Sequence, residues 1–186
     1  MEATSKSIPL NVALNNEERL KVVLFAATVT GGFTVVWFGM MIWLGAWMLA
    51  GSAALNGLAC VIAVVFARRG QRETANHVWL SGGIGTLALA AILMHPAANM
   101  NAMVAIMIAN AFLLFHGLDE LRVSASYVAG AILVWIATVI IHRMEIVPYE
   151  IGYDVATNVV RDFATFSILG SIGVQCGYFC LCRTSP

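Results

Sequence analysis

Four histidines are the residues of this chain best suited to hold a cofactor, and they pair by position. His77 and His116 lie at the ends of two apolar segments that we expect at one membrane face, and His95 and His142 at ends expected at the opposite face. Neutral imidazoles at matched depth on different helices are what two bis-histidine haem b sites require. However, His77 and His95 are about 27 Å apart along a helix, which puts both pairs at the membrane edges. Histidines that simply face interfacial water are the alternative.

Methionines gather near the face that carries His95 and His142. Met94, Met100 and Met103 are close to His95 in the sequence, and thioether and imidazole groups are soft ligands that suit Cu(I). The sequence therefore offers a metal site of Met94, His95, Met100 and Met103. Ordinary packing is the alternative, because methionine also fills irregular gaps between apolar side chains.

Chemistry of other kinds finds little support in the sequence. Ten basic and ten acidic residues cancel, so charge does not argue for a nucleic-acid partner. Neither a phosphate-binding glycine loop nor a nucleophile with a nearby base is visible. We therefore predict that the chain is not an enzyme, unless it belongs to a larger catalytic assembly.

The elements that must position these residues are apolar segments of about 20 residues. The chain is 60% hydrophobic and 11% charged, whereas soluble domains carry about 25% charged residues. About 20 apolar residues are needed for a helix to cross a hydrocarbon core about 30 Å thick. We predict an all-α polytopic membrane protein with a tail over 1–19, a transmembrane domain over 20–182 and a short end over 183–186. Its six helices are expected over 20–41, 46–67, 75–95, 98–117, 123–141 and 159–181.

Basic residues set the expected orientation in the bilayer, because cytoplasmic loops are enriched in Lys and Arg. Eight of them fall on one expected side, and Arg143 and Arg161 on the other. The sequence therefore predicts six crossings of the bacterial inner membrane with both termini in the cytoplasm.

Small and polar residues indicate how the helices pack. Gly82 and Gly85 on the third helix, and Gly173 and Gly177 in GxxxG spacing on the last, allow close approach. Packing within one chain and a dimer seam both remain open. Asn56 and Asn110 lie inside helices, where we expect each to bond a neighbouring helix.

Short stretches at the helix ends resemble a known class of membrane region. These are Phe-Ala-Arg-Arg-Gly (66–70), Leu-Phe-His-Gly-Leu (114–118) and a Gly-Tyr-x₄-Arg exit (177–183). The layout is similar to the six-helix N-terminal sensor regions of bacterial diguanylate cyclases, class III adenylate cyclases and histidine kinases. That resemblance implies a dimerising input module that signals through its last helix. Those proteins continue into a coiled coil and a catalytic domain, so we expect either a dissected input region or a protein whose output partner is another chain.

The first interpretation is thus a non-catalytic sensor or regulatory module in the lipid bilayer, forming a homodimer or joining another membrane subunit. A haem b electron-transfer subunit and an accessory subunit of a larger membrane complex are the alternatives.

Overall fold

The computed structural model describes residues 16–115 and 120–184, and helices account for most of that part of the chain. No strand forms there, and a single isolated bridge joins Met94 to Ile151. The all-α prediction is confirmed. The long helices are α1 (Asn16–Trp43), α2 (Trp47–Arg68), α3 (Arg72–Leu93), α4 (Asn101–Leu114), α5 (Leu121–Arg143) and α7 (Arg161–Thr184).

Four of these helices are long and apolar enough to cross a membrane. They include all or most of α1, α2, α3 and α5, in spans of 22 to 24 residues. A helix of 22 residues is about 33 Å long, which exceeds the hydrocarbon core of about 30 Å. Large apolar side chains cover their outer surfaces, among them Val35, Trp43 and Leu133, each more than 60% exposed. Such a surface is costly in water and suits lipid.

The helix α4 is shorter than the predicted span of 98–117. It begins at Asn101 and ends at Leu114, so it is about 21 Å long. A 3₁₀ turn, η1 (Pro96–Ala98), replaces the expected first turn, and Asn99 follows it with φ of 57°. Proline lacks a backbone N–H and a left-handed residue breaks the helical path, so α4 cannot start earlier.

The helix α7 begins at Arg161 and continues two helical turns that precede it. The single turn α6 (Tyr153–Val155) passes into a π-helical turn, η2 (Ala156–Val160), and then into α7. The loop predicted over 142–158 is therefore shorter and covers residues 144–152. Ala156 and Val160 of the π turn are fully buried, so core packing holds this irregular turn in place.

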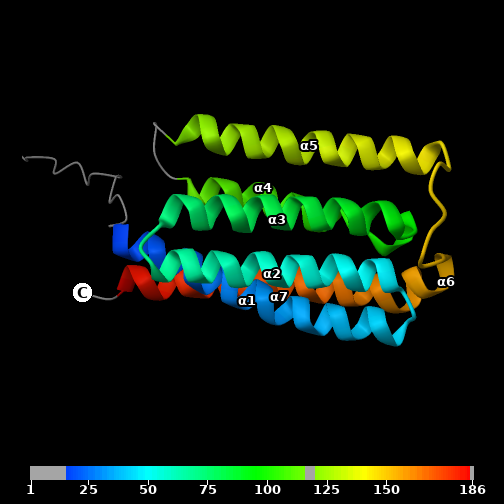
Figure 1. Cartoon of the computed structure of the whole chain (residues 1–186), viewed down its shortest axis with the longest axis horizontal. Coiled ribbons are helices and arrows are strands. Elements are labelled where there is room, and N and C mark those ends of the chain that lie inside the picture. The colour runs from blue at the N-terminus through cyan, green and yellow to red at the C-terminus, as the bar shows by residue number, and fades with distance from the viewer. Residues whose placement is uncertain (1–15, 116–119, 185–186) are drawn as a thin grey trace, which may run out of the picture.

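The helices lie roughly antiparallel in one bundle (Figure 1). Along the bundle, α1 contacts α2, α2 contacts α3, and α3 contacts both α4 and α5. The helix α7 contacts α1 and α4, which places it across the bundle from α5 (Figure 1). Residues 144–152 cross one end of the bundle to join α5 to α6, and the first turns of α1 and the end of α7 lie at the other end (Figure 1).

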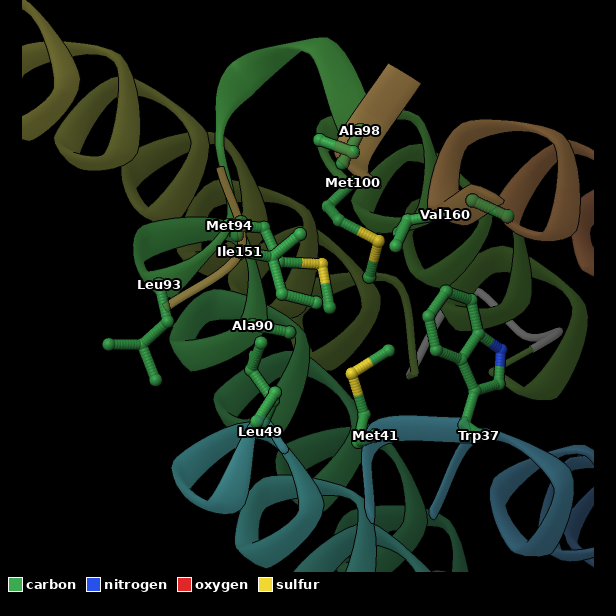
Figure 2. Close-up of a cluster of buried hydrophobic side chains, with 14 of the residues drawn as sticks. Trp37, Met41, Leu49, Ala90, Leu93, Met94, Ala98, Met100, Ile151 and Val160 are labelled. Carbon is green, nitrogen blue, oxygen red and sulfur yellow. The ribbon is translucent and has the colours of Figure 1, made fainter. Parts of the chain in front are cut away.

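Two buried apolar clusters fill the bundle, one toward each end. The loop 144–152 crosses the end of the bundle like a strap, and the cluster beside it is called the strap-side cluster. This cluster includes Trp37, Met41, Leu49, Met94 and Ile151 (Figure 2). The opposite cluster is centred on Val23, Cys60, Trp79, Leu80 and Ala111. The positive φ of Gly45 makes the tight α1–α2 turn at the strap-side end, where a side chain would be strained.

Candidate functional site

A cavity of about 120 Å³ lies inside the bundle, lined by α1, α2, α3, α4 and α7. Its walls take residues from both buried clusters, including Met41 and Met94 from the strap-side cluster and Met107 from the opposite one. Five helices therefore meet at this space. Cavities between helices of bundles are a common place for ligand sites.

Methionine side chains form much of the strap-side wall of the cavity. The cavity is lined by Met41 of α1, Met94 just after α3, Met100 just before α4 and Met103 within α4. Figure 2 shows the thioethers of Met41, Met94 and Met100 converging on a common region next to the Trp37 ring. These flexible, polarizable side chains adapt to irregular shapes.

Asn56 on α2 presents an unpaired carbonyl oxygen at the cavity. Its Nδ2 donates to the Oγ1 of Thr34 at 3.0 Å, and that hydroxyl donates to the backbone oxygen of Thr30 at 2.8 Å. Because the Thr34 proton is already used, the Thr34 oxygen can only accept, which fixes the orientation of the amide. The Oδ1 of Asn56 is buried and has no hydrogen-bond partner among the described residues.

Ser167 contributes a second unpaired polar group from α7. The residue is 3% exposed, lines the cavity, and its Oγ has no hydrogen-bond partner in the described part of the chain. Its neighbour on the same helix, Thr165, instead donates to the backbone oxygen of Arg161 at 2.8 Å. Asn110 of α4, 4% exposed, adds a carboxamide to the same wall. Buried polar groups are normally paired, so the unpaired atoms of Asn56 and Ser167 leave hydrogen-bonding capacity at the cavity wall.

The cavity walls carry no ionisable group among the described residues, since Asp, Glu, Lys, Arg, His, Cys and Tyr are all missing from the lining. The arrangement offers apolar contact and a few hydrogen bonds. Among the described lining residues, none can act as a general base or a charged nucleophile.

The four residues expected to form a metal site are not all found at this cavity. Met94, Met100 and Met103 line it, but His95 does not. The Nδ1 of His95 accepts from the backbone N–H of Ala97 at 3.1 Å, which caps η1. The imidazole therefore stabilises the η1 turn beside the cavity.

His95 and His142, the two histidines expected at the same membrane face, both contact one tyrosine. The ring centroid of Tyr149 is 5.0 Å from that of His95 and 5.5 Å from that of His142. Tyr153 packs on His95 from another direction at 5.2 Å. A haem between these imidazoles would have to share its space with the Tyr149 ring. The Nε2 of His142 is buried without a hydrogen-bond partner in the described residues.

His77, which the sequence pairs with His116, is hydrogen-bonded to α5. Its Nδ1 lies 2.6 Å from the hydroxyl of Tyr127, which is also 3.2 Å from the Oγ of Ser81. Phe115 stacks on the Tyr127 ring with centroids 5.8 Å apart. These contacts join α3 to α5. The predicted partner His116 lies outside the described residues.

The four glycines selected for close packing have different surroundings. A Cβ at Gly82 would overlap the Cβ of Ala59, so α2 and α3 approach closely there. Gly85 and Gly173 have open space at the Cβ position, and both are exposed. Gly177 lies in α7, in the stretch whose side-chain surroundings are outside the described set.

Two features of this region escape sequence reasoning. Ser167 is one serine among several in apolar helices, and nothing in its sequence neighbours marks it as unpaired. Glu150 lies in a loop, yet its carboxylate accepts from the backbone N–H groups of Met48 and Leu49 at the start of α2, at 2.8 and 2.9 Å. Of the cavity lining, sequence reasoning singled out Asn56 and Asn110, as amides inside apolar segments, and the methionines Met94, Met100 and Met103, as candidate metal ligands. No protein family, curated protein or solved structure compared with this chain matches it.

Proposed function

We propose that the chain is a non-catalytic sensor or regulatory module of the bacterial inner membrane, and that it passes a signal through α7. One observation carries this proposal: α7 supplies Ser167 to the wall of a buried, ligand-sized cavity. The last helix is thus the element that connects a binding event inside the bundle to whatever follows or contacts it. The absence of ionisable groups from the described lining supports binding over catalysis.

Contacts between α7 and α1 lie on both sides of Ser167. One helical turn before it, Phe163 packs edge-on against Trp37, with ring centroids 4.9 Å apart. After it, Gly170 lies so close to α1 that an added Cβ would be 3.1 Å from the Cζ of Phe33. An occupant that changes the shape of this wall must therefore shift α7 against α1. Packed helices respond to such changes by displacements of roughly 1–2 Å.

The proposed topology has six crossings and cytoplasmic termini. Arg68, Arg69, Arg72 and Arg122 lie at the bundle end opposite the loop 144–152, together with the first turns of α1 and the end of α7 (Figure 1). The positive-inside rule assigns that end to the cytoplasm. Both proposed cytoplasmic termini then lie where an output partner would act.

Filling the cavity from α7 is expected to displace that helix. Ser167 is buried at the cavity wall, so the ring of Ser167→Phe is expected to enter the cavity and imitate an occupant. We expect the distance between spin labels at Val35 and Leu169 to change by roughly 1–2 Å. Both positions are more than 60% exposed on the lipid-facing surface, where labels are tolerated. Double electron–electron resonance in nanodiscs measures this distance, with the four native cysteines replaced by alanine.

Thr165→Phe is the matched control, because it places the same ring on the exposed side of the same helix. Its label distance should equal that of the parent. An unchanged distance in folded Ser167→Phe, or the same change in both variants, would contradict signalling through α7.

We also propose that α7 forms the seam of a homodimer. Gly173 is exposed and has no atom within 4 Å of its Cβ position, so a second helix can approach there. We expect Gly173→Ile to weaken self-association about tenfold in nanodiscs, measured by energy transfer between labelled copies. Gly85→Ile, at an open glycine of α3, should leave it unchanged. A strictly monomeric parent chain would refute the dimer.

A further inference from the structure

The cavity wall has a polar part, a sulfur-rich part and no charge, which together specify a class of ligand. We propose that it binds a small neutral molecule with a single aromatic ring and one hydroxyl group, held by Asn56 and Ser167 among the methionines. This inference rests on the proposed function only in treating the cavity as the sensing site.

The size of the cavity limits the ligand to about one ring. Its volume is about 120 Å³. An engineered apolar cavity of about 150 Å³ in another protein stays dry and binds benzene or xenon. A cavity of this order suits a molecule with about one small ring, whereas a sterol or a haem is too large for the space as it stands.

The absence of charge requires a neutral ligand. No acidic or basic side chain lines the cavity among the described residues, and three of its five lining helices, α1, α2 and α3, are long and apolar enough to cross a bilayer. An ion there would lose its hydration without gaining a counter-charge, which is strongly unfavourable. A carboxylate, an amine or a phosphate is thus a poor occupant.

The composition of the walls favours an aromatic ring over an aliphatic chain. Met41, Met94, Met100, Met103 and Met107 all line the space. Thioether sulfur makes favourable contacts with aromatic rings, often at the ring edge. The rings of Phe33 and Trp37 offer further edge or face contacts from α1. A single ring surrounded by sulfur atoms satisfies these groups better than a flexible chain does.

Among the described residues, three that line the cavity carry an unpaired polar atom: Trp37, Asn56 and Ser167. The Nε1 of Trp37 can only donate, and the atoms of Asn56 and Ser167 together select a hydroxyl on the ring. Asn56 Oδ1 can only accept, and the Ser167 hydroxyl can both donate and accept. A ligand hydroxyl donates its proton to Asn56 and accepts the Ser167 proton, which satisfies both residues. A purely apolar molecule of the same size would leave both groups unpaired, which is costly in a buried site.

Phenol and toluene test this choice because they have nearly the same size and differ in the hydroxyl group. We expect the full chain in nanodiscs to bind phenol about tenfold more tightly than toluene, measured by isothermal titration calorimetry. The heats measured with nanodiscs that carry Ala53→Phe are subtracted, because this side chain fills the cavity from its wall. Ala53→Leu replaces this variant where the larger side chain prevents folding. This subtraction removes partition of either probe into lipid.

Substitutions at the cavity then show which residues cause the preference for phenol over toluene. Ser167→Ala and Asn56→Leu should each reduce the preference for phenol to within about twofold while toluene still binds. Ser126→Ala is the matched control, because its hydroxyl is exposed on α5 and donates to the backbone of Val123 at 2.7 Å. It should bind both probes as the parent does.

Three results would overturn the inference: equal affinities for phenol and toluene, equal binding by the Ala53 variants, or an undiminished preference in Ser167→Ala. Stoichiometric Cu(I) binding that excludes phenol and is lost in Met94→Leu would also overturn it, in favour of a metal. Phenol binding without any α7 displacement refutes the proposed function alone. Displacement in Ser167→Phe without phenol binding refutes only the ligand class.

Discussion

Glu120→Ala is expected to lower the free energy of unfolding by about 3 kcal/mol, since it leaves a partly buried guanidinium without its carboxylate. Arg72 is the first residue of α3 and forms an ion pair with Glu120, the residue that precedes α5. The two side chains are only 13% and 22% exposed. Glu120 contacts the Nη2 of Arg72, and the Nη1 is buried without a hydrogen-bond partner in the described residues. Unfolding by SDS in mixed micelles measures the change.

A double variant separates the loss of the pair from the cost of an isolated charge. Arg72→Met combined with Glu120→Leu removes both charges and keeps the volume, so it should lose less stability than Glu120→Ala does. The exposed pair Arg161–Asp162, with nitrogen and oxygen 3.5 Å apart and side chains 49% and 74% exposed, gives the control. Asp162→Ala should change stability by less than about 0.5 kcal/mol. A Glu120→Ala variant as stable as this control would contradict the prediction.

Glu150→Gln is expected to lower the free energy of unfolding by about 2 kcal/mol, because it removes a charged cap from the start of α2. Each carboxylate oxygen accepts one backbone N–H, from Met48 at 2.8 Å and Leu49 at 2.9 Å. A glutamine has one oxygen and an NH₂ group that cannot accept, so one N–H loses its partner. Capping residues stabilise helices by about 1 kcal/mol, and a negative charge at the positive end of the helix dipole adds to this. SDS unfolding in mixed micelles measures the loss.

Glu145→Gln is the matched control, since it makes the same change at an exposed position of the same loop. It should be neutral within about 0.5 kcal/mol. Hydrogen exchange supplies a local test, because the amides of Met48 and Leu49 should exchange faster in Glu150→Gln and at the parent rate in Glu145→Gln. Unchanged exchange in both variants would show that the carboxylate does not cap α2.

The effect of Glu150 extends beyond its own helix. Its backbone N–H donates to the carbonyl of Leu93 at 2.8 Å, and the N–H of His95 donates to the carbonyl of Ile151 at 3.2 Å. The loop 144–152 thereby joins the end of α3 to the start of α2 and leads into α7. Loss of the cap should loosen the wall of the cavity at its methionine-rich side.

The sequence alone predicted that the chain is all-helical, because long apolar segments that enter lipid must satisfy their own backbone hydrogen bonds. It did not predict the late start of α4 or the helical turns that precede α7. The same reasoning separated the helices expected over 20–41 and 46–67, and the structure places Gly45, with φ of +74°, in the turn between them. It also identified Asn56 and Asn110 as polar groups that need partners. Each of these inferences depends on neighbours within a few residues or on the general cost of burial.

Only the tertiary structure decided which polar groups are paired and which side chains share a space. Glu150 caps a helix that lies about 100 residues earlier in the sequence, and no local pattern announces such a contact. Met94 and Met107 come from separate elements yet line one cavity, whereas His95, next to Met94, faces tyrosines instead. The reason is geometric: each helix has several faces, and its neighbours determine which face is buried. The sequence lists the groups that are able to bind, and packing of the helices selects those that meet.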